Sequence, residues 1–414
     1  MIVGLDIGTS CIRVAIGEID EETQKLKIAG TACEKSTGLR NGNIVNIEAA
    51  SNAIQNAIRN AELNAGIDVR SCFTAIGGEQ IEGINASGKV AVSLKGKSQR
   101  EISEDDISRV RECAKAVPLS LDRQMLHLIP QDYIVDHVAG IKDPLHRLGV
   151  CLEAQVHIVT ASKTTIQNIQ TCINRAGYEM DGVFLKTLAS ADCVVNEDEM
   201  ELGSILIDLG AGTTDILLLL NGAPICTASI PVGGNLITND IAIEEGVSVA
   251  EAERIKLESG CCWEPNVNPS QTVIINGIGG QSPREVPQSE ICEIMAARVE
   301  EIFTMVRNRI LEGTNVTSLS GNIILVGGGA NMDGVVQMAQ EVFDTDNVRI
   351  GYPEKLGGIE EDYAGPEWTT VVGLVKACKN SINLQSKKAR KINKANKERN
   401  PNENKLLKFF KSIF

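Results

Sequence analysis

The sequence predicts an α/β protein with two lobes of similar build. Apolar strands recur along most of the chain, each followed by a turn and then by a further strand or a helix, which is the pattern of mixed α/β domains. One such unit, residues 2–16, is repeated at residues 204–220 with the shared order apolar residue, aspartate, apolar residue and glycine. A repeat over this distance indicates duplication. The 414 residues suffice for two lobes with separate cores.

Composition narrows the class of protein. With 43% hydrophobic and 23% charged residues, the chain is typical of a soluble globular protein, and it contains no apolar run long enough to predict a membrane span. Residues 1–6 lack a basic region and are not expected to form a signal peptide. The twelve cysteines show no metal-binding spacing, so we expect reduced thiols in core positions.

Charge is unevenly distributed along the chain. Residues 379–414 contain eleven Lys and Arg against two Asp and Glu, a balance of +9, which leaves −23 for residues 1–378. The acidic body argues against nucleic acid as a partner, because phosphate binding needs basic surface. The basic tail requires a separate explanation.

Hydrophobic periodicity predicts the main elements. Residues 380–404, rich in Lys, Asn and Ser, are expected to be a solvated linker. Helices are predicted at residues 47–63, 104–115, 164–176 and 289–311, strands within 68–95 and at 131–138 and 151–159, and a buried strand at 323–326 that precedes a helix from about residue 334.

Two glycine-containing turns carry the chemistry expected at a bound phosphate. In the first, Gly8 lets backbone N–H groups approach the phosphate, and Thr9 and Ser10 add hydroxyl donors. Asp6, ahead of this turn, is placed to hold Mg²⁺ through water, and Arg13, behind it, could meet the terminal phosphates. The second turn repeats this chemistry from the other lobe, with Asp208 in the position of Asp6 and with the phosphate-binding candidates Gly210, Ala211, Gly212, Thr213 and Thr214.

A third glycine segment follows the strand at residues 323–326. Gly327, Gly328 and Gly329 would let an adenine or ribose lie against bare backbone. Each of the three segments alone could be an ordinary glycine turn. Together, in this order, they favour a nucleotide site.

Residues 6–10, 208–215 and 327–330 resemble the phosphate-1, phosphate-2 and adenosine motifs of the actin/Hsp70/sugar-kinase superfamily. The resemblance implies an actin-like two-lobed ATPase fold made of duplicated RNase H-like domains, with ATP and Mg²⁺ as cofactors.

A fourth segment is similar to the one in which Hsp70-like members bind the ribose. One helical turn separates its Glu and Lys and places them on one face, although a surface ion pair is an equal alternative. The adenosine-binding candidates in this segment are Gly233, Gly234, Asn235, Glu253 and Lys256.

Within the superfamily, the chain is similar to the bacterial FtsA family over essentially its whole length. Residues 127–136, 140–144 and 152–160 resemble the family's signature for an inserted subdomain, 1C, and residues 4–10 and 188–191 also match. The resemblance implies subdomain 1A at 1–83 and 163–196, the FtsA-type inserted subdomain 1C at 84–162, subdomain 2A at 197–236 and 306–378 with a return to 1A, subdomain 2B at 237–305, a linker at 379–404 and a C-terminal amphipathic helix at 405–414.

The resemblance also implies a function: an actin-like ATP-binding protein that polymerises on the inner face of the cytoplasmic membrane at the division site and anchors the FtsZ ring there. It implies that the FtsZ C-terminal peptide binds subdomain 2B, that filaments form through subdomains 1C and 2B, and that 1C recruits later division proteins. Arg284 and Arg298 are candidate contacts for the acidic peptide, with an ordinary solvated role as the favoured alternative for each.

The chain departs from the family pattern at several positions. Lys186 and Thr187 stand where relatives commonly have Glu-Pro, while His146-Arg147 and Cys151 differ within subdomain 1C. A lysine cannot act as a carboxylate base at neutral pH but can attract a γ-phosphate. We therefore expect ATP to be bound better than it is hydrolysed.

The last ten residues predict a membrane-binding helix. At 100° per residue, six apolar side chains fall within an arc of about 160°, and lysines fill the rest, which is typical of an interfacial anchor for anionic lipid. A helix of about 15 Å is weak alone, so we expect polymerisation to supply avidity. The membrane-binding candidates are Lys405, Leu406, Leu407, Lys408, Phe409, Phe410, Lys411, Ile413 and Phe414.

Three alternatives to this interpretation are open. The tail could dock on the protein's own core, although the polar linker and the lysines disfavour this. A sugar or acetate kinase of the same fold would need a catalytic Asp and would have no use for the tail. A pilus-assembly ATP-binding protein would lack both the tail and the 1C signature.

Overall fold

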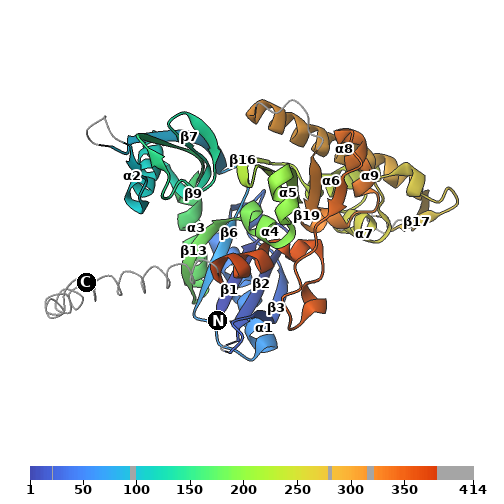
Figure 1. Ribbon diagram of the computed structural model, residues 1–414. Coiled ribbons are helices and arrows are strands. Elements are labelled where there is room, and N and C mark those ends of the chain that lie inside the picture. Colours follow the sequence, from blue (N-terminus) through green and yellow to red (C-terminus); the bar gives the residue numbers. More distant parts are fainter. Residues whose placement is uncertain (21, 94–98, 278–281, 315–320, 380–414) are drawn as a thin grey trace.

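The computed structural model describes residues 1–379 apart from 21, 94–98, 278–281 and 315–320. Two five-stranded sheets form the centres of two lobes, and a third unit projects from the first lobe (Figure 1). The predicted linker and the predicted membrane helix lie outside the described residues. Among the helices that are described, none is long and apolar enough to cross a membrane.

The first sheet has the order β13-β6-β1-β2-β3. Its middle strand begins an antiparallel meander, and the two strands on the other side run parallel to it. Helices α1 (Ile47–Ala65) and α3 (Lys163–Arg175) bury their apolar faces against it. The strands are β1 (Ile2–Ile7), β2 (Cys11–Ile19), β3 (Leu26–Lys35), β6 (Ser71–Ile76) and β13 (Glu179–Leu185).

The second sheet repeats this arrangement strand for strand. Its order is β16-β15-β14-β19-β20, again with an antiparallel meander on one side of the first strand and two parallel strands on the other. The prediction of two lobes of similar build is therefore confirmed. The strands are β14 (Ser204–Leu209), β15 (Thr214–Leu220), β16 (Ala223–Ile230), β19 (Asn322–Val326) and β20 (Val348–Ile350).

An inserted unit, residues 81–162, separates β6 from α3 in the chain. It has its own four-stranded sheet of order β10-β9-β12-β7 and its own core, closed by helix α2 (Glu104–Ala114). In Figure 1 the unit stands beside the first lobe with β7 near β16 of the second. Its strands are β7 (Ile81–Ala91), β8 (Arg100–Glu101), β9 (Arg123–Val135), β10 (Val138–Ile141), β11 (Leu148–Gly149) and β12 (Cys151–Ser162).

Helices complete the second lobe around one large core. The longest described helix, α8, crosses the outer part of this lobe (Figure 1). The elements are α6 (Gly234–Glu244), α7 (Val249–Ser259), η1 (Glu264–Asn266), β17 (Thr272–Ile275), β18 (Arg284–Pro287), α8 (Gln288–Gly313), η2 (Gly328–Asn331) and α9 (Val335–Phe343).

The chain crosses between the lobes twice. It leaves the first lobe through α4 (Lys186–Val194) and α5 (Glu197–Leu202), and it returns after β20, where helical residues 369–379 pack on the first sheet. The close fit needs glycine, because a Cβ on Gly4 would lie 2.9 Å from the carbonyl oxygen of Val371. The short elements are β4 (Leu39–Arg40), β5 (Asn43–Ile44), η3 (Glu360–Tyr363) and η4 (Pro366–Trp368).

The four helices predicted with both ends are all present, with ends that differ by no more than two residues, and the helix predicted from about residue 334 is α9, which begins at Val335. The predicted strand at 131–138 was wrong in its bounds, since β9 begins at Arg123 and ends at Val135. Pro130 sits inside this strand beside a register shift against β12, which relieves the lost backbone donor. All twelve cysteines are free thiols, and eight of them are buried.

Candidate nucleotide site

The two predicted phosphate turns have the same backbone geometry. In the first, the N–H of Gly8 donates to the carbonyl of Cys11 at 3.1 Å, and in the second, the N–H of Gly210 donates to that of Thr213 at 3.0 Å. Each turn closes an antiparallel hairpin in which the aspartate of the first strand lies one pair from the end. The duplication therefore extends from the sheets to the turns.

The two turns approach each other across the lobes. A Cβ on Gly212 would lie 2.7 Å from the hydroxyl oxygen of Thr9 and 2.8 Å from the Cα of Asn41. The same hydroxyl oxygen accepts a hydrogen bond of 2.9 Å from the N–H of Gly42. Only a glycine lets the second turn come this close to the first.

The predicted adenosine segments converge on the second turn. A Cβ on Gly327 would lie 2.2 Å from Oδ1 of Asp208, and one on Gly329 would lie 2.7 Å from the Cβ of Leu209. From another side, the N–H groups of Gly234 and Asn235 donate to the carbonyls at 210 and 211 at 3.0 and 2.8 Å. The two segments at residues 233–235 and 327–329 thus both lie against residues 208–211.

Glu253 and Lys256 form more than a surface ion pair. Their charged groups lie 2.7 Å apart. The ammonium of Lys256, which is largely buried, also donates to the carbonyl of Gly234 at 3.2 Å and to the hydroxyl of Thr238 at 2.8 Å. The pair therefore borders the Gly233–Asn235 segment, as the sequence predicted, and its contact with a ribose stays a prediction.

Lys186 is the first residue of α4 and lies between the aspartates of the two hairpins. Its Nζ is 3.3 Å from Oδ2 of Asp208 and 3.9 Å from Oδ2 of Asp6, and its side chain is 17% exposed. Burial alone would lower the pKa of Lys186, but the carboxylates of Asp208, Asp6 and Asp215 together raise it. The lysine is therefore charged at neutral pH.

The aspartates around Lys186 are buried. Burial raises the pKa of Asp6 and of Asp215, and the positive charge of Lys186 opposes this in both. Asp215 also joins the lobes, because its Oδ1 accepts a hydrogen bond of 2.8 Å from the N–H of Gly78 at the end of β6. Both carboxylate oxygens of Asp208 are buried and accept no hydrogen bond, so Lys186 is the group that compensates their charge.

Arg13 faces Asp6 across the first hairpin. Its guanidinium carbon lies 5.8 Å from the ring centre of Trp368, and its Nε is buried without a hydrogen-bond partner. The segment that carries Trp368 touches the adenosine motif directly, since the N–H of Gly327 donates to the carbonyl of Pro366 at 3.1 Å. An unpaired buried donor beside the first turn suits a phosphate oxygen.

Asp6 and Asp208, the predicted Mg²⁺ ligands, face the ammonium of a lysine. Within the described part of the chain, no group of three or more His, Cys, Asp and Glu side chains is arranged to hold a metal. Asp6 and Asp208 already share the ammonium of Lys186. Their predicted role as Mg²⁺ ligands is untested and would require this lysine to move.

Sequence reasoning assigned no role to three residues of the candidate site. Asp215 and Gly78 connect the lobes through one hydrogen bond, and Trp368 reaches the first turn from near the end of the described chain. The duplicated hairpin could have indicated Asp215, because it occupies the register position of Arg13. Nothing in the local sequence marks the other two.

The two arginines predicted to contact the acidic peptide lie elsewhere on the second lobe, and each already pairs with a carboxylate of the protein. Arg284, on β18, pairs with Glu245. Arg298, on α8, donates to both carboxylate oxygens of Asp240 at 2.6 and 3.0 Å. Neither arginine is free to meet a peptide without giving up an internal partner.

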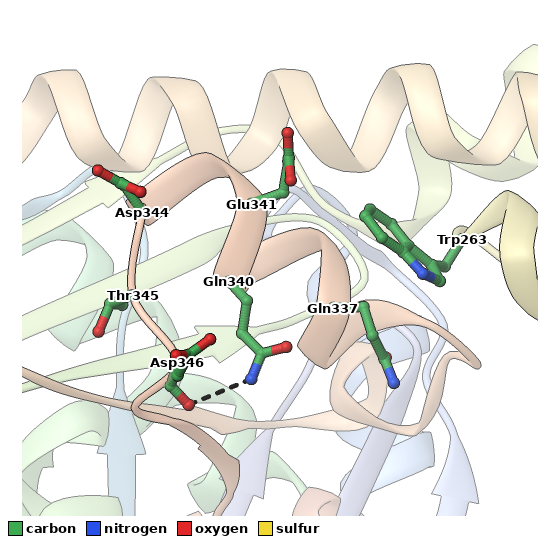
Figure 2. Close-up of a pocket in the computed structure, with 7 residues that line it drawn as sticks. All are labelled: Trp263, Gln337, Gln340, Glu341, Asp344, Thr345 and Asp346. Atoms are coloured by element: carbon green, nitrogen blue, oxygen red, sulfur yellow. Dashed lines mark hydrogen bonds between the residues drawn. The ribbon is translucent and has the colours of Figure 1, made fainter.

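A separate cavity of about 410 Å³ lies at the C-terminal end of α9 (Figure 2). It contains none of the predicted site residues, and its carboxylates would repel a polyphosphate. Its polar walls include a hydrogen bond of 3.1 Å from the amide of Gln340 to the carbonyl of Asp346. The lining residues are Trp263, Gln337, Gln340, Glu341, Asp344, Thr345 and Asp346.

Comparison with sequence families gives two matches. The family described as "Cell division protein FtsA" matches residues 205–373, and the family described as "SHS2 domain inserted in FTSA" matches residues 78–160. The second match covers nearly all of the inserted unit.

Relatives match over most of the chain. Cell division protein FtsA of Borreliella burgdorferi is 40% identical over 96% of this chain and 96% of its own length. The protein of the same name from Pseudomonas aeruginosa is 38% identical over 91% and 88%, and that from Escherichia coli is 33% identical over 92% and 91%.

Solved structures of low sequence identity share the fold. The PilM-PilN type IV pilus biogenesis complex includes a chain with a TM-score of 0.63 and 16% identity, with 91% of this chain and 98% of that one covered. MreB 5 of Spiroplasma citri bound to AMPPNP has a TM-score of 0.56 and 14% identity over 94% and 98%. The fold is therefore actin-like, with an SHS2 domain inserted in the first lobe.

Proposed function

The chain belongs to the FtsA family of cell division proteins, and on that premise we propose that it is an ATP-binding tether that holds the FtsZ ring to the cytoplasmic membrane. The proposal has three parts: a nucleotide in the cleft between the lobes, a lipid surface at residues 405–414, and the FtsZ C-terminal peptide on the second lobe. Each part has its own support and its own test.

The nucleotide part rests on one observation above all. The two glycine turns have matching geometry and meet across the lobes at Thr9 and Gly212, which is where a polyphosphate bound by both lobes would lie. The MreB 5 neighbour is described as bound to AMPPNP, so this fold accommodates an adenine nucleotide. We assign the phosphates to residues 8–10 and 210–214, with Arg13, and the adenosine to residues 233–235, Glu253, Lys256 and 327–329.

Weak hydrolysis is part of the proposal. The first residue of α4, Lys186, offers an ammonium beside the two phosphate turns, and an ammonium cannot accept a proton from an attacking water. We expect phosphate release from ATP to be far slower than for an active chaperone ATPase. A phosphate-release assay at saturating ATP tests this, and comparable turnover would refute it.

The membrane part rests on the segregation of apolar and basic residues in 405–414. Co-sedimentation with anionic liposomes, using the full chain and a chain that ends before Lys405, tests it. The full chain should pellet and carry FtsZ with it, while the shortened chain should leave both in the supernatant. Equal recruitment of FtsZ by the two proteins would reject the tether.

Filament formation supplies the avidity that a short helix lacks. We propose that subunits associate through the inserted unit and the helical part of the second lobe, and that the inserted unit also receives later division proteins. Liposome binding should therefore rise steeply with protein concentration as filaments form. Binding that is unchanged when polymerisation is blocked would contradict this.

The peptide part concerns residues 237–305. Arg298 holds Asp240 through two hydrogen bonds, so an acidic peptide would have to compete with an internal carboxylate. Titration of a labelled FtsZ C-terminal peptide into the wild-type protein and an Arg298→Ala variant tests the assignment, with Arg307→Ala on the same helix as control. A loss of affinity confined to Arg298→Ala supports it; identical affinities for all three proteins would reject Arg298 as a contact.

A further inference from the structure

A buried positive charge that belongs to the protein itself lies between the aspartates of the two hairpins. We propose that the ammonium of Lys186 takes the place of the divalent cation between Asp6 and Asp208, so that this chain binds ATP without Mg²⁺. The inference rests on the proposed binding of ATP and adds which cation the site uses.

The distances indicate that the ammonium of Lys186 takes the place of a hydrated Mg²⁺ and leaves no room for one beside it. Mg²⁺ holds water at about 2.0–2.1 Å, and a water donates to a carboxylate at about 2.7 Å, so a hydrated ion lies roughly 4 Å from the carboxylate oxygen. The ammonium is 3.3 Å from Asp208 and 3.9 Å from Asp6. It therefore occupies the space that a hydrated ion would need between the same two oxygens.

Packing holds the lysine in this place. A Cβ on Gly77 would lie 3.4 Å from the Cβ of Lys186, so the stem of the lysine lies against the end of β6. Farther along α4, a Cβ on Gly373 would overlap the carbonyl of Ala189 at 1.9 Å. The helix that presents the lysine is thus pressed against the returning chain and cannot shift freely.

Asp208 keeps the ammonium from leaving. Its two carboxylate oxygens are buried and have no hydrogen-bond donor, so removal of the lysine would leave a buried charge without compensation, which is strongly unfavourable. A divalent ion can replace the ammonium only if the lysine side chain finds another partner at the same time. Where it stays, it presents a point charge of the kind that commonly binds phosphate.

Isothermal titration of the full chain with ATP, once in excess Mg²⁺ and once in EDTA, tests the proposal. We expect dissociation constants in the two buffers to agree within threefold. A loss of tenfold or more in EDTA would overturn the proposal while leaving ATP binding intact. No binding in either buffer would overturn the ATP assignment as well, so the two failures are distinguishable.

Two variants test whether Mg²⁺-independent binding of ATP depends on Lys186 in particular or on any partly buried lysine. Lys186→Gln should bind ATP at least tenfold more weakly in EDTA than in Mg²⁺, because the divalent ion then has to supply the missing charge. Lys376→Gln removes a partly buried lysine that pairs with Glu354 outside the site, and it should behave like wild type in both buffers. Equal behaviour of the two variants would contradict the assigned role of Lys186.

A measurement without nucleotide gives a second readout. Electron paramagnetic resonance of added Mn²⁺ should show no uptake at the cleft of the wild-type protein and a bound ion in Lys186→Gln. Uptake by the wild-type protein that Asp208→Asn abolishes would show that the lysine does not exclude the metal, and would overturn the proposal.

Discussion

Acid should weaken the attachment of the inserted unit to the second lobe through one buried histidine. His157, on β12, is 1% exposed and lies between the two. Its Nδ1 donates to Oδ1 of Asn85 at 2.7 Å, and its Nε2 accepts from the hydroxyl of Thr227, on β16, at 2.9 Å. The tautomer follows because the amide nitrogen of Asn85 is occupied as a donor to the carbonyl of Ile225. A neutral imidazole satisfies every partner.

The size of the expected loss of stability follows from the pKa of His157. Burial lowers the pKa of His157 from its ordinary value of 6.5 to about 4. The unfolded chain therefore takes up a proton below about pH 6.5, while the folded chain does so only near pH 4. The contribution of neutral His157 to the free energy of unfolding is fully present above pH 6.5. It is lost as the pH falls from about 6.5 to about 4. The loss amounts to about 2 kcal/mol by pH 5 and about 3 kcal/mol when complete.

Urea denaturation from pH 7 to pH 4.5 measures the effect, with hydrogen exchange at β16 to localise it. His157→Gln can keep both hydrogen bonds but cannot titrate, so its loss of stability over this range should be smaller by about 2 kcal/mol at pH 5. His146→Gln replaces an exposed histidine of the same unit and should follow the wild-type curve. Parallel curves for wild type and His157→Gln would refute the reasoning.

Three further predictions concern the site and the inserted unit. Gly212→Ala should weaken ATP binding about tenfold in a titration, because the new methyl group would force the two phosphate turns apart at a cost of about 1–3 kcal/mol; unchanged affinity would show that the turns do not act together. The side chain of Asp106 completes the capping box of α2 with Ser103 and pairs with two half-exposed arginines, so Asp106→Ala should cost about 1–2 kcal/mol and lower the melting temperature, whereas Asp105→Ala, on the exposed side, should not. In a Trp263→Phe background Trp368 is the remaining tryptophan of the two, and its fluorescence should change on addition of ATP because it stacks on Arg13; a constant signal would place the nucleotide elsewhere.

The fold could be predicted because its signals are local and repeated. The hairpins at residues 2–16 and 204–220 share one pattern, and the structure gives them equivalent positions in two sheets of equivalent order. The long amphipathic helices were found for the same reason, since an apolar face recurs within a few residues. The short helices α4, α5, α6 and α7 were not predicted as such, because their burial depends on neighbours distant in sequence.

The site could be predicted in part. The glycine turns could be found in the sequence, and the structure brings them together at Thr9 and Gly212, while their binding of a phosphate stays a prediction. The sequence marks Lys186 as a departure from the family but does not predict its partnership with Asp6 and Asp208, because this depends on where α4 begins relative to the two hairpins. Trp368 was missed because 354 residues separate it from Arg13 in the printed sequence.

The return of the chain to the first lobe has a mechanical consequence. Helical residues 369–379 pack on the first sheet, and the ammonium of Lys379 donates to the carbonyl of Gln24, in the connection between β2 and β3. This connection lies at the opposite end of β2 from the phosphate turn. The part of the chain that the structure describes therefore ends on the first lobe, at the end of β2 away from the first glycine turn. Any hinge motion between the lobes would move the second lobe and its helices relative to Lys379, whose position on the first lobe would stay fixed.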